Sequence, residues 1–302
     1  MTQETKRNLA LVASFSVLAL ISVLPTGQIA PRQETASVFE AIHVKEVVRK
    51  DVPIIEAKTA LVYDYGTRTA LYEKDADIPM PMASLTKIIT VSYVLDHANI
   101  DEKVLISKHA LATSGNSLLV AGDILSVRDL AAMAMVESSN DAVMALVEHI
   151  AKKDSIAPSQ AEQWILPYLQ RHAESLGASH VTLTSATGLD GPQSTAGAYG
   201  SARDLVTMAG KTIGSEMWGV ENIDTVTSAK GRVYRLKPTN EIKDGIPVLL
   251  GSKTGLTEVA GGNLLVTLEY PIGNPVGIVV MGSSAEGRFR DVQALYAWLT
   301  GK

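Results

Sequence analysis

The sequence predicts an α+β fold, in which an antiparallel sheet with flanking helices accompanies an all-helical lobe. Two strand-like runs near the start form a hairpin, the middle of the chain has helical spacing of apolar residues, and the last part returns to strands before a final helix. Because both ends of the domain supply strands, we expect the first hairpin to join the later sheet.

The hairpin is predicted from residues 57–64 and 69–73. Both runs are rich in residues that favour strands, and Gly66 lies in the turn between them. The folded domain therefore begins near residue 57.

Helical spacing of apolar residues begins at about residue 84 and continues to about residue 96. This places Ser84 at or near the first turn of a helix and Lys87 on the same helical face. Later helices are predicted over 130–136, 141–151 and 161–176 and after residue 201. Strands are predicted over 248–253, 262–270 and 276–282, followed by a helix over about 288–299.

The composition fits a folded protein with no nucleic-acid partner. The chain has 302 residues, 46% of them hydrophobic and 20% charged, and its net charge of -5 provides no broad basic surface. It has no cysteine, and its 6 histidines form no His-x-x-x-His pair. A zinc site therefore has no ready set of ligands, and we expect neither a metal nor a cofactor.

The N-terminus predicts export. Lys6 and Arg7 precede an uncharged stretch over 9–24, which is typical of a secretory signal but also near the short limit for a retained membrane anchor. Both alternatives stay open for residues 1–24, and both put the rest of the chain on the extracytoplasmic side. Residues 25–56, with three prolines and mixed charges, are predicted to be a tether.

Three short motifs occur in order: Ser84-x-x-Lys87, Ser138-Ser139-Asn140 and Lys253-Thr254-Gly255. One Ser-x-x-Lys alone indicates little, since a capping serine and a solvated lysine are the ordinary explanation. Together the motifs supply a nucleophile, an amine one helical turn away, a second hydroxyl with an amide, and a cationic strand end. These are the parts of an acyl-transfer site that has no histidine base.

A lysine can take the proton of Ser84 only as a neutral amine. From a pKa of about 10.4, deprotonation at pH 7 costs roughly 4.6 kcal/mol. Burial lowers the pKa, and so does a second cation. If Lys253 lay about 5 Å from Lys87, the repulsion would be about 3 kcal/mol at an effective dielectric constant near 20. We therefore expect the two lysines to lie together.

The remaining motif residues fit roles around this pair. Ser138 is expected to relay the proton and Asn140 to hold a substrate amide, while Lys253 and Thr254 bind a carboxylate. Gly255 leaves room for a substrate backbone against the strand. A helix start at Ser84 would stabilise the developing oxyanion.

These motifs and their flanking residues resemble the D-alanyl-D-alanine carboxypeptidases of peptidase family S11. These are low-molecular-mass penicillin-binding proteins, within the wider group that includes serine β-lactamases. The resemblance runs from about residue 57 to the C-terminus. It rests on the runs Pro81-Met82-Ala83-Ser84-Leu85-Thr86-Lys87, Ser185-Ala186-Thr187-Gly188-Leu189-Asp190-Gly191, Ser201-Ala202-Arg203-Asp204-Leu205, Gly251-Ser252-Lys253-Thr254-Gly255-Leu256-Thr257 and 282–295.

The resemblance implies a DD-peptidase/β-lactamase-like transpeptidase fold with the active site between two lobes. We expect a domain over 57–302, with an α/β lobe over 57–80 and 200–302 and a helical lobe over about 81–199. The resemblance implies that Ser84 is the nucleophile, that Lys87 is the base, and that Ser138 and Asn140 form the second motif. It implies that Lys253 and Thr254 bind the substrate carboxylate and that Arg288 is a cation near it. The oxyanion donors would be the backbone amides of Ser84 and Leu256.

Two departures from the family pattern affect these expectations. Ser139 stands where this subfamily more often has glycine, and it is expected to narrow the cleft or alter substrate preference. The chain also stops after the terminal helix, without the extra β-rich domain and amphipathic tail of many relatives. Attachment to the membrane through the N-terminal segment would take the place of that tail.

The implied activity is removal of the terminal D-alanine from peptidoglycan stem peptides through an acyl-enzyme on Ser84, with β-lactam antibiotics as covalent inhibitors. A D,D-endopeptidase that cuts cross-links would use the same residues. A class A-like β-lactamase is less favoured, because no Glu-x-x-Leu-Asn pattern lies between Asn140 and Lys253. A non-catalytic peptidoglycan-binding protein with the same fold is the remaining alternative.

Overall fold

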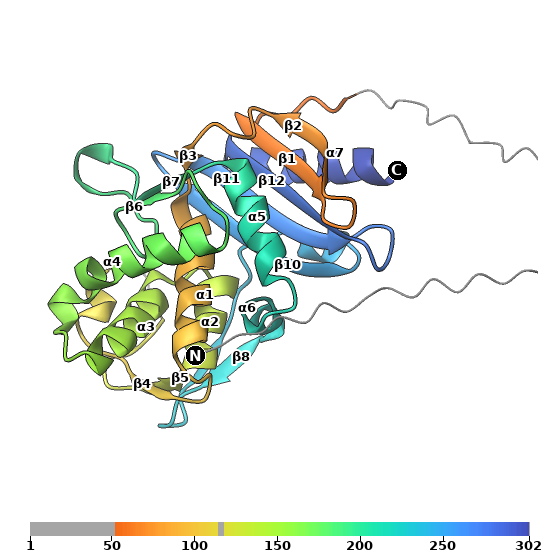
Figure 1. Ribbon diagram of the computed structural model, residues 1–302. Coiled ribbons are helices and arrows are strands. Elements are labelled where there is room, and N and C mark those ends of the chain that lie inside the picture. The colour runs from red at the N-terminus through yellow and green to blue at the C-terminus, as the bar shows by residue number, and fades with distance from the viewer. Residues whose placement is uncertain (1–51, 114–117, 302) are drawn as a thin grey trace, which may run out of the picture. The chain divides into compact units, whose positions relative to one another are not determined.

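Strands from both ends of the folded region form a five-stranded antiparallel sheet in the order β10-β11-β12-β1-β2. The computed structural model describes residues 52–113 and 118–301 (Figure 1). Strand β1 pairs with β12, with Thr59 opposite Met281, which confirms that the first hairpin joins the later sheet. The strands are β1 (Thr59–Asp64), β2 (Thr69–Lys74), β10 (Leu249–Thr257), β11 (Gly261–Glu269) and β12 (Pro275–Ser283).

Successive side chains of the central strands enter two different hydrophobic cores, because neighbouring residues of a strand point to opposite faces. Leu264 packs in one core with Val292 of helix α7 (Gly287–Thr300). Leu265 packs in the other core with Leu205 of helix α5 (Ala202–Thr212). The sheet is therefore covered by helices on both faces, as the near-continuous apolar run of β11 requires.

Four helices make up the middle of the chain and gather to one side of the sheet (Figure 1). They are α1 (Lys87–His97), α2 (Val127–Val136), α3 (Asn140–Lys153) and α4 (Pro158–Ser175). Each overlaps a helix that the apolar spacing predicts. The start of α2 is fixed by a capping box, in which the Ser126 hydroxyl accepts from the backbone N–H of Asp129 while the Asp129 carboxylate accepts from the backbone N–H of Ser126.

The sequence did not predict the short elements. These are the strands β3 (Met80–Pro81), β4 (Lys103–Leu105), β5 (Ile124–Ser126), β6 (Thr182–Leu183), β7 (Ala198–Gly200), β8 (Thr225–Thr227) and β9 (Val233–Arg235), helix α6 (Glu216–Gly219), and the 3₁₀ turns η1 (Ala83–Thr86), η2 (Ala110–Ala112), η3 (Pro192–Ser194), η4 (Val220–Asn222) and η5 (Lys243–Gly245). Runs this short span too few residues to show a periodicity.

The N-terminal predictions fall mainly outside the described residues. The signal or anchor over 1–24 lies there entirely, as does the tether over 25–56 up to residue 51. The backbone N–H groups of Glu56 and Ala57 each donate to the Asp291 carboxylate at 2.8 Å, so the end of the predicted tether is fixed to α7. Among the residues that the structure describes, none of the helices is both long and apolar enough to span a bilayer.

The division into two lobes stays a prediction. Helix α6 and turn η4 belong to the part of the chain assigned to the α/β lobe, yet α6 contacts α1 and both α6 and η4 contact α2. Helix α5 likewise contacts β1 and β12 on one side and α1 on the other. The part of the chain assigned to the α/β lobe therefore packs closely against helices assigned to the helical lobe.

Candidate active site

Ser84 lies in the 3₁₀ turn η1, which leads directly into α1. The preceding residue, Ala83, has a left-handed backbone with φ of 48°. The segment before it is held by Asn263 of β11, whose side-chain amide donates to the carbonyls of Pro81 at 2.9 Å and Met82 at 3.1 Å. The expected position of Ser84 at a helix start is confirmed, and the sheet fixes the turn that carries it.

Lys87 is completely buried, with 0% exposure, and its side chain turns back toward Ser84. The Nζ atom of Lys87 lies 2.7 Å from the Ser84 Oγ, 2.7 Å from the Asn140 Oδ1 and 2.9 Å from the carbonyl oxygen of Thr187. Burial, and secondly the charge of Lys253, hold the pKa of Lys87 well below its ordinary value. A serine hydroxyl and an amine with a lowered pKa are therefore in hydrogen-bond contact.

The second motif lies at the start of α3. Ser139 is the N-cap, since its hydroxyl accepts from the backbone N–H of Ala142 at 3.2 Å. Asn140, the next residue, turns its side-chain oxygen to Lys87. Ser138 precedes the cap with a left-handed φ of 60° and is half-buried. The serine that replaces the more usual glycine thus stabilises the helix start.

Lys253 and Thr254 lie inside strand β10, so the prediction that this motif ends a strand is wrong. The strand continues because β11 pairs with it as far as Thr257. Lys253 is 1% exposed, and its ammonium donates to the carbonyl of Thr254 at 3.1 Å. The hydroxyls of Thr254 and Thr239 lie 2.6 Å apart.

Gly255 allows β10 to approach the turn that carries Ser84. A β-carbon on Gly255 would lie 2.9 Å from the carbonyl oxygen of Met82, closer than side-chain atoms normally come. The carbonyl of Gly255 accepts from the Arg288 guanidinium at 2.9 Å, and that guanidinium also lies over the Phe289 ring. Arg288 is therefore buried rather than solvated, and burial lowers its pKa. Leu256, by contrast, is 49% exposed.

The run Ser185 to Gly191 wraps around η1. It supplies the Thr187 carbonyl to Lys87, and the carbonyl of Ala186 accepts from the Thr90 hydroxyl at 2.7 Å. Asp190 reaches the far end of β10, where it accepts from the Thr257 hydroxyl at 2.9 Å and the backbone N–H of Val259 at 3.0 Å. This run thus joins the start of α1 to the end of strand β10.

Glu221, which belongs to the short turn η4, was not predicted from the sequence as part of the site. Its carboxylate accepts from the backbone N–H of Ser252 at 2.8 and 2.9 Å. Burial raises the pKa of Glu221 to about 7, against the effect of the Ser252 N–H and of Lys253. Burial also lowers the pKa of Lys253 to about 7, and the Glu221 carboxylate opposes this change while Arg288 reinforces it. The hydrogen bonds from Ser252 favour the charged carboxylate.

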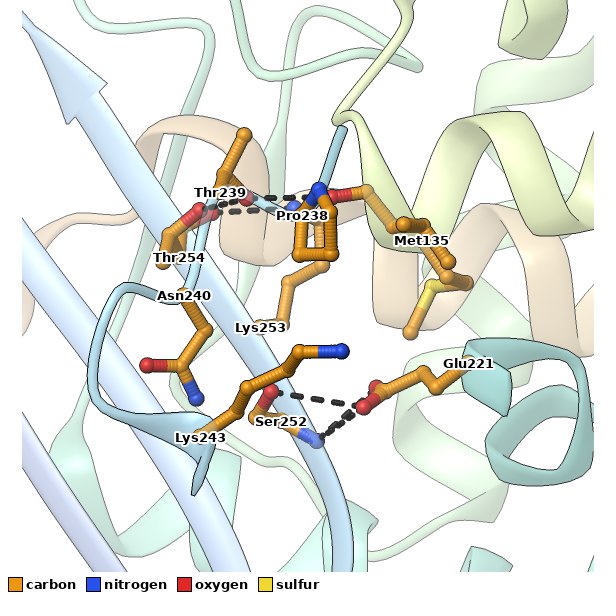
Figure 2. A pocket seen from close by; sticks show the side chains of 10 residues that line it. Met135, Glu221, Pro238, Thr239, Asn240, Lys243, Ser252, Lys253 and Thr254 are labelled. Carbon is orange, nitrogen blue, oxygen red and sulfur yellow. Dashed lines mark hydrogen bonds between the residues drawn. The ribbon is translucent and has the colours of Figure 1, made fainter. Parts of the chain in front are cut away.

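A small cavity of about 20 Å³, roughly the size of one water molecule, adjoins this group (Figure 2). It is lined by Met135, Val136, Glu221, Pro238, Thr239, Asn240, Lys243, Ser252, Lys253 and Thr254. Over residues 52–113 and 118–301, no group of three or more histidine, cysteine, aspartate or glutamate side chains is arranged to hold a metal ion. The contact between the Ser84 hydroxyl and the Lys87 amine supplies the groups for acyl transfer.

Comparison with known proteins gives consistent results. A family model described as D-alanyl-D-alanine carboxypeptidase matches residues 46–285. The chain is 27% identical to the D-alanyl-D-alanine carboxypeptidase DacC of Escherichia coli, over 82% of this chain, and it spans only 62% of the length of that relative. It is 28% identical to the D-alanyl-D-alanine endopeptidase of Escherichia coli, covering 83% of this chain and 79% of the relative.

Among solved structures, Penicillin-Binding Protein D2 of Listeria monocytogenes in its ampicillin-bound form is 29% identical. The match has a TM-score of 0.66 and covers 83% of this chain and 99% of that chain. The predicted α+β fold of the DD-peptidase type is confirmed by this likeness together with the antiparallel sheet and its helices.

Proposed function

Because this chain belongs to the D-alanyl-D-alanine carboxypeptidase family, we propose that it is a serine D-Ala-D-Ala carboxypeptidase that trims peptidoglycan stem peptides through an acyl-enzyme on Ser84. The observation that carries the proposal is the 2.7 Å contact between the Ser84 hydroxyl and the buried amine of Lys87. A nucleophile beside a base whose pKa is lowered is the minimum that such chemistry needs.

The surroundings of Lys87 fit a neutral amine. A neutral amine has two N–H bonds and one lone pair. The Asn140 side-chain oxygen and the Thr187 carbonyl can only accept, so they take the two N–H groups. In the charged state Lys87 donates to the Ser84 hydroxyl at 2.7 Å as well. In the proposed neutral state the lone pair is left for that hydroxyl, which then donates to Lys87.

In the acylation step the Ser84 oxygen attacks the carbonyl carbon of the penultimate D-alanine, and Lys87 takes the hydroxyl proton. The tetrahedral intermediate collapses with cleavage of the C–N bond, and Ser138 relays the proton from Lys87 to the leaving amine of the terminal D-alanine. Water then cleaves the ester and restores the Ser84 hydroxyl. The backbone N–H groups of Ser84 and Leu256 are proposed to stabilise the oxyanion.

The third motif is proposed to bind the terminal carboxylate of the substrate. Lys253 and the Thr254 hydroxyl supply a cation and a donor, and Arg288 adds positive charge behind them while its guanidinium holds the Gly255 carbonyl. Strand β10 is the edge of its sheet, so a substrate backbone can add to it as a further strand, with Gly255 leaving the space. Asn140 would contact the substrate amide.

The relatives also support two proposals about the setting. Since a structural relative is described in an ampicillin-bound form, we propose that β-lactams acylate Ser84 covalently. Since the relatives named above are bacterial, we propose that the chain acts on the extracytoplasmic face of a bacterial envelope, secreted or anchored by residues 1–24.

Intact-mass spectrometry of the protein incubated with penicillin tests the nucleophile directly. We expect a long-lived adduct of one penicillin on the unaltered protein and none on Ser84→Ala. Release of D-alanine from a peptide ending in D-Ala-D-Ala tests the activity. A protein that forms no adduct and releases no D-alanine would contradict the proposal and favour a non-catalytic peptidoglycan-binding protein, whereas rapid turnover of penicillin would indicate a β-lactamase.

The likeness to an endopeptidase supports a second candidate function, cleavage of D,D cross-links by the same residues. Purified cross-linked and uncross-linked muropeptides distinguish the two. Release of monomers from the cross-linked substrate, at a rate above that of D-alanine release, would favour the endopeptidase.

A further inference from the structure

The site contains two buried lysines, Lys87 and Lys253, and the mechanism depends on which of them carries the positive charge. Lys87 and Lys253 are 0% and 1% exposed, and their charges act on one another. Two ammonium groups in a dry site repel one another. The state in which only one of the two lysines is charged is therefore favoured. The proposed mechanism works only when Lys87 is neutral and Lys253 is charged.

The surroundings of the two lysines differ in charge. The oxygens in contact with Lys87 come from the uncharged Ser84, Asn140 and Thr187, and the charge that lowers its pKa is that of Lys253. Lys253 instead lines the same cavity as the Glu221 carboxylate of η4, whose charge raises the Lys253 pKa, while the charge of Arg288 on α7 lowers it. Because the Glu221 carboxylate raises the pKa of Lys253, the positive charge is favoured on Lys253 rather than on Lys87.

Glu221 is held firmly in the position from which it acts. Both of its carboxylate oxygens accept from the backbone N–H of Ser252, the residue next to Lys253, and the Ser252 hydroxyl adds a contact at 3.3 Å. Glu221, Lys253 and Lys243 of η5 all line the cavity of Figure 2, where the Glu221 carboxylate and the Lys243 ammonium point into the same space. The ammonium of Lys243 and the N–H of Ser252 both favour the ionised carboxylate.

We propose that Glu221 is a positioning residue that holds the one positive charge of the lysine pair on Lys253 and thereby leaves Lys87 neutral as the base. The inference rests on the proposed function of Ser84 and Lys87 and adds the group that sets their charge. Glu221 touches neither the substrate nor the nucleophile. It acts through Lys253, across the cavity that they share.

Glu221→Gln removes the charge but keeps a side-chain oxygen that can accept from the Ser252 N–H. Glu258→Gln is the matched control, because Glu258 is an exposed carboxylate in the turn that follows β10. The measurement is the second-order rate constant for acylation by a fluorescent penicillin between pH 5 and pH 10. The unaltered protein is expected to give a bell-shaped profile, whose alkaline limb reports loss of the Lys253 proton.

In Glu221→Gln the alkaline limb of the profile should move by about one pH unit to lower pH. The maximum of the acylation rate constant should fall about tenfold, which corresponds to one pKa unit. Glu221→Asp should return part of the shift, and Glu258→Gln should leave the profile in place. Lys243→Met should move the limb in the same direction by a smaller amount, because the Glu221 carboxylate loses one of its cations. A merely structural Glu221 would lower the rate at every pH without moving the limb, and that result would overturn the inference.

A second measurement needs no catalysis. NMR titration of protein with ¹³C-labelled lysine side chains, assigned with Lys87→Met and Lys253→Met, should show Lys253 losing its proton at higher pH than Lys87. Glu221→Gln should narrow or reverse that order. If Lys87 and Lys253 lose their protons in the same order, equally far apart, in Glu221→Gln, the inference is wrong. If the unaltered protein shows the expected order but is not labelled by penicillin, only the proposed function is wrong.

Discussion

Gly188 packs against Ala83 so closely that a β-carbon on Gly188 would lie 1.9 Å from the Ala83 carbonyl oxygen. Gly188 also has a φ of 82°, which other residues rarely adopt. Ala83 precedes the proposed nucleophile, so this contact fixes the backbone on which Ser84 stands.

Gly188→Ala should therefore lower the free energy of unfolding by more than the backbone strain alone. Gly214 has a φ of 79° and open space around it, so Gly214→Ala measures the left-handed strain alone, about 1 kcal/mol. Gly188→Ala should cost a further 1–3 kcal/mol or so for the overlap and should slow penicillin acylation. Urea unfolding of both variants checks this. If both variants lost the same free energy of unfolding, the backbone near Ala83 would be able to move away from the new methyl group without an energetic penalty.

Asn140→Asp should raise the pKa of Lys87. The new carboxylate would occupy the position of an oxygen that now lies 2.7 Å from the Lys87 Nζ, and an adjacent negative charge favours the ammonium. Acylation at pH 7 should then fall by about tenfold to a hundredfold, and the rising limb of the pH profile should lie at higher pH than in the unaltered protein. Asn140→Ala removes the hydrogen bond without adding charge. If its profile matched that of Asn140→Asp at every pH, the carboxylate would not be acting on Lys87.

Acylation of the unaltered protein should depend on pH with two limbs of opposite sign. The rate should rise with pH as Lys87 loses its proton, through a pKa well below the ordinary lysine value. It should fall again as Lys253 loses its proton, through a pKa of about 7. Lys87→Ala should lower the rate by about 10² to 10⁴ and remove the rising limb. A rising limb that persists in Lys87→Ala would assign the base to another group.

Asn263→Ala should reduce stability and acylation together. The side chain is completely buried, and besides its two bonds to Pro81 and Met82 its oxygen accepts from the backbone N–H of Gly282 at 2.8 Å. Leaving these groups unsatisfied should cost about 2–4 kcal/mol in urea unfolding. Asn274→Ala is the control, since Asn274 bonds to Asp64 and Tyr270. It should lose stability but keep its acylation rate, and a parallel loss of both properties would point to a general effect of destabilisation.

The sequence predicts the long elements of this fold well, because their periodicity is local. The helix at 84–96, the first hairpin and the terminal helix all follow from the spacing of apolar residues. It also predicts that Ser84, Lys87 and Asn140 belong together, since each motif carries a recognisable set of reactive groups. The prediction of a strand end at Lys253 is wrong because strand length is decided by pairing with β11, a tertiary contact.

Other parts of the site have no local signature. Glu221 lies in a 3₁₀ turn, and its proximity to Lys253 depends on how α6 and η4 pack against β10 and α2. Asn263 is a polar residue within the mostly apolar strand β11. Its role depends on the segment before η1, whose Pro81 carbonyl accepts from the Asn263 side chain. Ser139 could be recognised as a departure from the family pattern, but its use as an N-cap required the position of α3.

The left-handed backbone at Ala83 and Ser138 also limits which substitutions the site can accept. A branched side chain at either position would add strain of about 1–3 kcal/mol beside the reacting groups. Single-step variants with valine, isoleucine or threonine there should therefore be rare among functional descendants. Substitutions would more readily be accepted at exposed positions without this backbone strain, such as Leu256 of β10.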